Sequence, residues 1–124
     1  MSTVTLDTGS LIALERRHQR MWKVMQRAQS LGVVAVVPAD VVAEWWRART
    51  AIREHILASV AVEPLTEKLA KLAGECLAAM AGATVVDAIV MASAAQRGDA
   101  VYTSDVPDLE RLRAFFPGVR VFAA

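Results

Sequence analysis

The chain has 124 residues, of which 55% are hydrophobic and 22% charged, and its formal net charge at pH 7 is +1. This composition excludes an intrinsically disordered chain, and the length predicts one domain, residues 1–124, with a single core. No apolar run approaches the ~20 residues of a membrane-spanning helix. No secretory signal begins the chain, so we expect a cytoplasmic protein with no membrane association.

The predicted secondary structure alternates strands with helices along the whole chain. The β-branched run VVAVV, residues 33–37, is typical of a strand buried on both faces, and Asp40 is the expected cap of the helix after it. The single cysteine, Cys76, lies in the apolar stripe of an amphipathic helix, where we expect it to pack. In chain order, the predicted elements are a strand at 3–6, helices at 10–17 and 19–30, a strand at 33–37, helices at 39–49 and 51–59, a strand at 60–62, helices at 66–81 and 84–97, a strand at 100–103, a helix at 106–116 and a strand at 119–122.

This alternation predicts an α/β fold, a three-layer α/β/α domain around a mostly parallel central sheet. In such sheets, ligands bind beyond the carboxyl ends of the strands. Asp7 directly follows the first strand, and Asp105 follows the strand at 100–103. Both acids are therefore expected at the edge of the sheet where ligands bind.

Further acids lie in helical segments that leave the same edge. Glu44 lies in VVAEWW, Asp87 lies in TVVDAIVM, and Asp108 follows Asp105 by three residues. Each acid also has a purely structural explanation. Asp7 and Asp105 can cap the helices that follow them, Asp87 is spaced from Thr84 as in a capping box, and Glu44 can lie on a solvated helix face.

Taken together, these acids predict a metal site. Several carboxylates at one place are unfavourable unless a cation or hydrogen bonds compensate their charge. Oxygen ligands with few histidines select Mg²⁺ or Mn²⁺. His18 and His55 lack the i, i+4 spacing of a zinc helix, and one cysteine cannot form a cysteine-based zinc site.

Basic residues are concentrated in two segments of the chain. An acidic pocket within a basic surface suits an enzyme that acts on a polyanion, although the same side chains are also explained as solvated surface charges. The two basic segments contain Arg16, Arg17, Arg20, Lys23 and Arg27, and Arg47, Arg49 and Arg53.

At these acids the sequence resembles the PIN-domain ribonucleases, the fold of the VapC-type toxins of bacterial toxin–antitoxin pairs. The resemblance covers essentially the whole chain. The four family acids match Asp7 in VTLDTGSLIAL, Glu44 in VVAEWWR, Asp87 in TVVDAIVMASAA and Asp105 in VYTSDVPDL. Asp108 matches a further acid that often assists. Gly9 departs from the pattern, because the family often has serine or asparagine there, so Thr8 or Ser10 is expected to supply the polar contact near Asp7.

The resemblance implies hydrolysis of RNA phosphodiester bonds with Mg²⁺ or Mn²⁺. It implies that Asp7, Asp87 and Asp105 hold the metal, with Asp108 as a further ligand, and that Glu44 orients or deprotonates the attacking water. The implied partners are an RNA substrate, a second copy of the chain in a homodimer, and a cognate antitoxin whose segment lies across the active-site groove. Thr103 or Ser104 is a candidate to contact a ligand or phosphate oxygen.

Two alternatives from other classes stay open. A non-catalytic PIN scaffold would bind RNA or a protein without cutting. A phosphotransfer enzyme of the haloacid dehalogenase type also has an aspartate after its first strand, but it needs a second aspartate two residues later, where this chain has Gly9. Trp45 and Trp46 point about 100° apart on a helix, so one is expected in the core and the other at the surface or in an interface. Met21, Trp22 and Met25 are candidates for either place.

Overall fold

A computed structural model describes residues 2–124 of the chain. Its centre is a five-stranded sheet with strand order β3-β2-β1-β4-β5, in which every neighbouring pair is parallel. The strands are β1 (Thr3–Leu6), β2 (Val34–Pro38), β3 (Ala61–Glu63), β4 (Ala100–Thr103) and β5 (Arg120–Ala123). The sequence predicted a mostly parallel sheet, and within the described residues it is parallel throughout.

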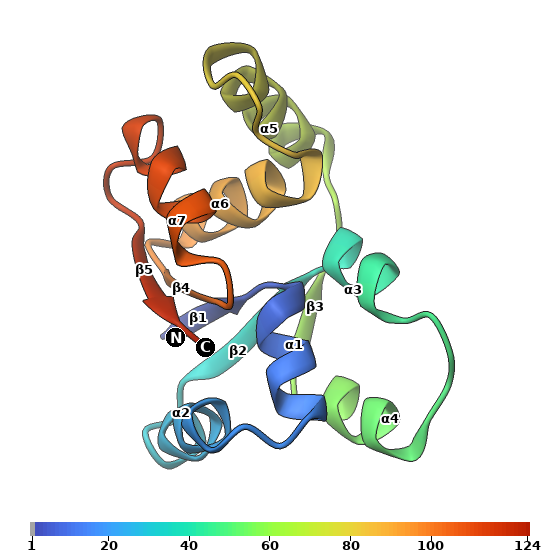
Figure 1. The fold of residues 1–124 in the computed structure, drawn as a ribbon. Helices are drawn as coiled ribbons and strands as arrows, with labels where there is room; N and C mark the ends of the chain where they lie inside the picture. The colour runs from blue at the N-terminus through green and yellow to red at the C-terminus, as the bar shows by residue number, and fades with distance from the viewer. Residues whose placement is uncertain (1) are drawn as a thin grey trace.

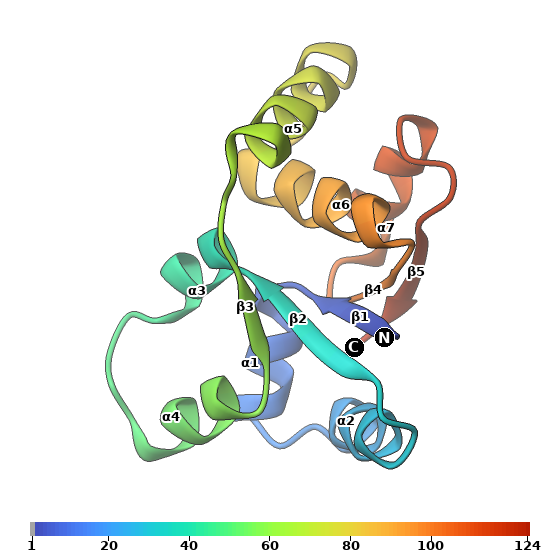
Figure 2. The ribbon, with the colours of Figure 1, turned by 180° about the vertical axis from the view of Figure 1, so that it is seen from behind.

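Helices cover both faces of this sheet, which confirms the predicted three layers. Helices α1, α2 and α4 lie on one side, α6 and α7 lie on the other, and α5 packs against α6 away from the sheet (Figures 1 and 2). The helices are α1 (Thr8–Glu15), α2 (Gln19–Ser30), α3 (Ala39–Trp45), α4 (Ala51–Ala58), α5 (Glu67–Ala79), α6 (Val85–Arg97) and α7 (Val106–Arg111), with a 3₁₀ turn at Leu112–Ala114. None of the helices in residues 2–124 is long and apolar enough to span a bilayer.

Local side-chain chemistry sets several helix boundaries. The hydroxyl groups of Thr50, Thr66 and Thr84 each accept a hydrogen bond from a backbone N–H in the first turn of their helix. Helix α6 ends at Gly98, whose φ of 73° is the left-handed conformation that glycine adopts most readily. These caps place α4, α5 and α6 within one or two residues of their predicted starts.

Two helices end well before the residues that the sequence predicted. The helix predicted over 39–49 ends at Trp45, and the residues that follow, 47–50, are exposed and contribute nothing apolar to the core. The helix predicted over 106–116 tightens into a 3₁₀ turn after Arg111, ahead of Pro117. Proline cannot continue a helix and restricts the residue before it, so this segment closes early.

The apolar core lies between the sheet and the two helical layers. Cys76 is buried in it as a free thiol, as expected for a packing role. Trp45 is buried and Trp46 is half-buried, in an edge-to-face pair with ring centroids 5.8 Å apart. Met21 and Met25 are also in the core, so these two methionines are not part of an exposed interface.

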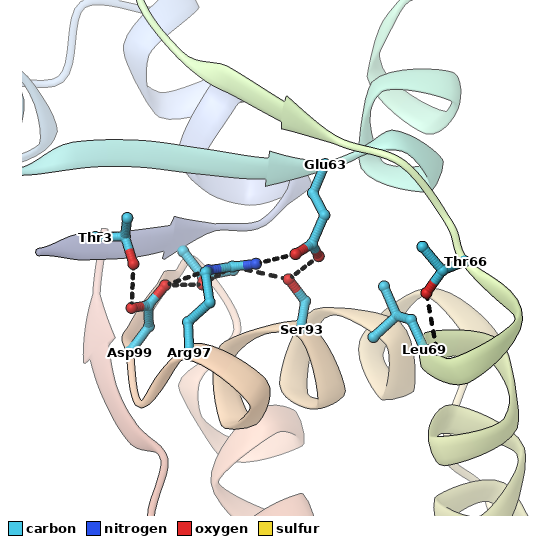
Figure 3. A network of polar contacts seen from close by, with 8 residues as sticks. Thr3, Glu63, Thr66, Leu69, Ser93, Arg97 and Asp99 are labelled. Carbon is cyan, nitrogen blue, oxygen red and sulfur yellow. Dashed lines mark hydrogen bonds and ion pairs between the residues drawn. The ribbon is translucent and has the colours of Figure 1, made fainter. Parts of the chain in front are cut away.

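A partly buried polar network ties β1 and the end of β3 to α6 (Figure 3). The guanidinium of Arg97 donates to Asp99 at 2.9 Å, to the hydroxyl of Thr5 at 2.8 Å, and to Glu63. Thr3 and Thr5 donate to the two oxygens of Asp99 at 2.5 and 2.9 Å. The network joins β1, β3 and α6, and it holds a carboxylate that is only 3% exposed.

Candidate active site

The sequence-predicted acids lie at the carboxyl edge of the sheet and on the helices that leave it. Asp7 directly follows β1 and is the N-cap of α1, and Asp105 follows β4 after Ser104 and occupies the N-cap position of α7 without a capping hydrogen bond from its side chain. Because β1 and β4 are neighbours in the sheet, these two strand ends are adjacent. Asp87 lies in the first turn of α6, Asp108 in the first turn of α7, and Glu44 near the end of α3.

Asp7 is the buried member of the group. Its carboxylate accepts a hydrogen bond from the backbone N–H of Ser10 at 2.9 Å, so the expected capping role is confirmed. Burial raises the pKa of Asp7, and the hydroxyl of Thr103 is the main contact that opposes the rise. Thr103 also accepts a hydrogen bond from the backbone N–H of Asp105 at 2.9 Å. One buried threonine therefore links the two acids that end neighbouring strands.

Asp87 has an unfavourable environment for its negative charge. Burial raises its pKa, and the hydroxyl of Thr84, which caps α6, acts in the opposite direction. Three other carboxylates then raise the pKa of Asp87 further through charge repulsion: Asp7, Asp108 and Asp105. Acids from separate parts of the chain therefore act on Asp87 at this edge.

Asp108 is exposed and interacts with Asp105. The pKa of Asp108 is raised by a hydrogen bond that its protonated carboxyl donates to Asp105, and the negative charge of Asp105 adds to the rise. Arg111 on the same helix opposes it. Asp105 and Asp108 are therefore close enough for their negative charges to repel each other.

Glu44 is supplied by α3, a different element from those that carry the aspartates. It is exposed, and one carboxylate oxygen accepts a short hydrogen bond from the hydroxyl of Thr8. Its negative charge also raises the pKa of Asp7 slightly. Of the two polar residues near Asp7, Ser10 therefore contacts Asp7 through its backbone N–H, whereas the hydroxyl of Thr8 contacts Glu44.

A groove of about 230 Å³ begins at Glu44 and runs along α1 and α3. Three arginines from the predicted basic segments line it, namely Arg16, Arg47 and Arg53. Arg53 is neutralised by Glu15 at 3.1 Å, so Arg16 and Arg47 are the side chains that bring positive charge to this groove. A polyanion that lies in the groove would reach the acids from the side of Glu44.

The acids fit a hard divalent cation in their chemistry, but their side chains are not arranged as a finished coordination shell. Within residues 2–124, no three His, Cys, Asp or Glu side chains stand close enough together to hold a metal ion. The donor atoms are carboxylate oxygens, and the mutual repulsion around Asp87 is of the kind that a cation would relieve. The predicted metal ligands therefore remain candidates.

The prediction that Asp40 caps α3 is wrong. The N-cap position is Pro38, and Asp40 lies inside the first turn. Both carboxylate oxygens of Asp40 are buried, and neither has a hydrogen-bond partner among the residues that the structure describes. Burial raises the pKa of Asp40 to about 6, with smaller increases from the negative charges of Glu44 and Glu63. A sequence pattern cannot reveal this, because the burial comes from the packing of α3 against the rest of the fold.

This environment predicts that Asp40→Asn stabilises the protein at neutral pH. The folded-state pKa lies above the ordinary 3.8, so the stability gained from the protonated carboxyl is complete below about pH 4 and is lost as the pH rises through about 6. We expect a gain of about 1 kcal/mol at pH 8, less than the full shift implies because Asp40 is only half-buried and partly screened by solvent. Urea denaturation of the wild type and of Asp40→Asn at pH 4 and pH 8 measures the difference in their free energies of unfolding. The control is Glu75→Gln on the exposed face of α5, and an equal difference at both pH values would contradict this account.

Close packing at Gly9 explains why this chain departs from the family pattern there. A Cβ atom on Gly9 would lie 1.9 Å from the side-chain oxygen of Ser104 and 2.7 Å from its Cβ. The side chain of Ser104 therefore fills the space that a side chain at position 9 would take. The loop that carries Asp105 packs directly onto the start of α1.

The same fold is found in chains of solved VapBC and FitAB complexes. A chain in the crystal structure of VapBC2 from Rickettsia felis, bound to a DNA fragment from their promoter, matches with a TM-score of 0.77 and 12% sequence identity, over 98% of each chain. A chain of the DNA-bound VapBC from Salmonella typhimurium matches with a TM-score of 0.75 and 18% identity, over 99% of this chain and 98% of that one. A chain of FitAcB from Neisseria gonorrhoeae matches with a TM-score of 0.62 and 20% identity, over 96% of each.

No protein-family model and no curated protein sequence matches the chain. The structural matches extend over nearly the full length of both partners, whereas the sequence identities are low. They confirm the fold that the four acid motifs implied. The chain therefore has the PIN-like α/β fold that it shares with these chains of VapBC and FitAB complexes.

Proposed function

We propose that the protein is a Mg²⁺- or Mn²⁺-dependent ribonuclease and the toxin of a toxin–antitoxin pair. The observation that carries the proposal is the placement of Asp7 and Asp105 beyond the adjacent ends of β1 and β4, with Asp87 and Asp108 in the first turns of α6 and α7. The structural matches to chains of VapBC and FitAB complexes support the toxin role. A site built only from carboxylates, beside a groove with Arg16 and Arg47, suits a phosphodiester substrate.

In this proposal, Asp7, Asp87, Asp105 and Asp108 would hold the metal. When bound, the ion would lower the pKa of a water molecule and offset the charge that develops on the phosphate. The chain positions these acids through contacts of its own. The backbone N–H of Ser10 fixes Asp7, and Thr103 joins Asp7 to the backbone of Asp105.

Glu44 would orient the attacking water and accept its proton. The Thr8 hydroxyl donates to one carboxylate oxygen of Glu44 and leaves the other oxygen available. The exposure of Glu44 gives solvent and substrate access to it. Arg16 and Arg47 would bind the backbone of RNA in the groove that begins at Glu44, because the guanidinium group matches phosphate geometry.

The proposed metal site predicts that divalent cations stabilise the protein through the acids. At a free metal concentration 100 times the dissociation constant, a site present only in the folded state contributes about 2.7 kcal/mol. We expect MgCl₂ or MnCl₂ to raise the melting temperature of the wild type and to have much less effect on Asp87→Asn. Differential scanning fluorimetry at constant ionic strength measures both, with Glu75→Gln as a control that keeps the full rise. Equal rises in the wild type and Asp87→Asn would contradict metal binding at this site.

We also propose that the protein acts in the cytoplasm, forms a homodimer and binds a cognate antitoxin. Matches to chains that were crystallised as VapBC and FitAB complexes support the antitoxin partner. Light scattering after size exclusion at micromolar concentration tests the dimer, and a monomer would contradict it. Co-expression with the neighbouring reading frame tests the antitoxin.

A further inference from the structure

A second groove lies on another surface of the molecule, between α2 and the sheet. It encloses about 440 Å³ and contains none of the five candidate site acids. Its walls are mostly apolar, and Leu31 on its rim is 61% exposed, so it extends the apolar surface of the groove. The residues that line this α2–β4 groove are Val4, Arg20, Lys23, Val24, Arg27, Ala28, Leu31, Val33 and Tyr102.

The apolar surface continues from the groove across the open face of β4 and β5. Tyr102 pairs in register with Leu6 of β1 and with Phe122 of β5, so these side chains lie on the same face of the sheet. The rings of Tyr102 and Phe122 are 5.5 Å apart, and Phe122 is 42% exposed. On the α2 side of the sheet, none of the helices in residues 2–124 crosses β5, whereas α7 lies against β5 on the other side (Figures 1 and 2).

Positive charge borders this apolar surface. Arg20, Lys23 and Arg27 line the groove, and no aspartate or glutamate is among its lining residues. Helix α2 itself, QRMWKVMQRAQS, contains no acid, and within residues 2–124 none of its three cations pairs with a carboxylate. Arg120 extends the basic border on β5, with its guanidinium carbon 5.9 Å from the centre of the Phe122 ring. The border therefore complements a negatively charged partner.

We propose that the α2–β4 groove binds an acidic amphipathic segment of a partner protein. Its apolar side chains would fill the groove, and its aspartates and glutamates would pair with Arg20, Lys23 and Arg27. Helices that bind in grooves use apolar residues at i, i+3, i+4 and i+7 for contact, and charged pairs at the rim set orientation and partner choice. This inference does not depend on nuclease activity, because the groove shares no residue with the candidate active site.

The floor of the groove favours a protein segment over a nucleic acid. Single-stranded nucleic acids bind by stacking their bases on aromatic rings along a basic track. Here the floor is aliphatic, formed by residues such as Val4, Val24 and Val33, and the ring of Tyr102 already packs against Phe122. An aliphatic floor offers bases no stacking surface, whereas it stabilises buried leucine or valine side chains.

Fluorescence anisotropy with labelled probes tests the proposal. The first probe is a helical peptide with leucines at the i, i+3, i+4 and i+7 spacing and glutamates elsewhere. A second peptide has lysine in place of each glutamate, a third has serine in place of each leucine, and a fourth probe is oligo(U). We expect only the first to bind well, and the others to bind about tenfold more weakly or worse, a difference of at least about 1.4 kcal/mol.

Matched variants locate the binding. The double variant Arg20→Glu, Arg27→Glu changes the basic rim, and Leu31→Glu changes the exposed apolar residue. Each should lower the affinity for the first peptide about tenfold or more. The controls make the same charge changes elsewhere: Lys68→Glu with Lys71→Glu on α5, and Gln26→Glu on another face of α2. These controls should keep wild-type affinity. Circular dichroism verifies that each variant is folded.

Hydrogen exchange of the wild type, with and without the acidic peptide, gives a readout that needs no variant. We expect slower exchange in α2, β4 and β5. No binding of the acidic peptide, or protection elsewhere in the chain, would overturn the proposal. If oligo(U) binds and the Arg20→Glu, Arg27→Glu variant loses this binding, the groove is a nucleic-acid surface and the proposal is overturned. If phosphatidylserine vesicles bind and the same variant loses this binding, the groove is a membrane surface and the proposal is likewise overturned.

Discussion

Arg97→Leu is expected to destabilise the protein by about 3 kcal/mol, because it leaves buried carboxylates without their cation. Arg97 pairs with Glu63 and with Asp99, and their side chains are 23% and 3% exposed. Thr3 and Thr5 still donate to Asp99 in the variant, which is why the expected loss is at the lower end of the range for a broken buried ion pair. Urea denaturation at pH 7 measures the change.

An exposed ion pair provides the matched control. Arg49 pairs with Glu54 at 3.1 Å, but these side chains are 80% and 51% exposed, so Arg49→Leu should cost less than about 1 kcal/mol. Adding Asp99→Asn to Arg97→Leu should restore part of the stability, because it removes the unpaired buried charge. If Arg97→Leu costs no more than Arg49→Leu, the network in Figure 3 does not stabilise the fold.

Gly9→Ala is expected to reduce both stability and activity. The added Cβ would clash with the side chain of Ser104 and lie 3.0 Å from its backbone nitrogen, so rotation of the hydroxyl alone cannot make room. Overpacking of this kind costs about 1–3 kcal/mol. The loop must move away from α1, and this movement displaces Asp105 from Asp7. We therefore expect a loss of RNA cleavage that exceeds the unfolded fraction at the assay temperature.

A second substitution distinguishes this clash from a general glycine effect. Ser104→Gly in the Gly9→Ala background removes the two closest contacts and should restore much of the stability and cleavage. Gly74→Ala is the control, since a Cβ there meets nothing within 4 Å and lies inside α5. It should stabilise the protein by about 0.5–1 kcal/mol, the usual gain for alanine over glycine in a helix. A Gly9→Ala variant that behaves like Gly74→Ala would rule out the proposed packing.

The parts of the fold that follow local rules were predictable. Strand β1 and helix α2 have the bounds that the sequence predicted, because an alternating apolar segment and a helical period with a glycine stop are local signals. The adjacency of Asp7 and Asp105 followed from parallel strands whose carboxyl ends share an edge. Glu44 and Asp87 were predicted from their places in apolar helical segments that leave the same edge, and the resemblance to the PIN-domain ribonucleases then matched them to family acids.

What the sequence could not reveal depends on contacts between distant residues. The partners of Arg97 include Thr5 and Glu63, which are separated from it by 92 and 34 positions, and no periodicity links them. The space taken by Ser104 over Gly9 depends on how the loop after β4 closes onto α1. The missing hydrogen bonds of Asp40 reflect the same limitation, since its position after β2 resembled an ordinary helix cap.

The central claim is that the acids at the sheet edge cut RNA with a divalent metal. The most direct test incubates a pool of mixed structured RNAs with the purified protein in Mg²⁺, in Mn²⁺ and in EDTA, beside folded Asp87→Asn. We predict cleavage with metal, none in EDTA, and a loss of about 100-fold or more in Asp87→Asn, since each 1.36 kcal/mol of lost transition-state stabilisation is a factor of ten. No cleavage with either metal, by folded protein free of any bound inhibitor, would contradict the claim and favour a non-catalytic scaffold.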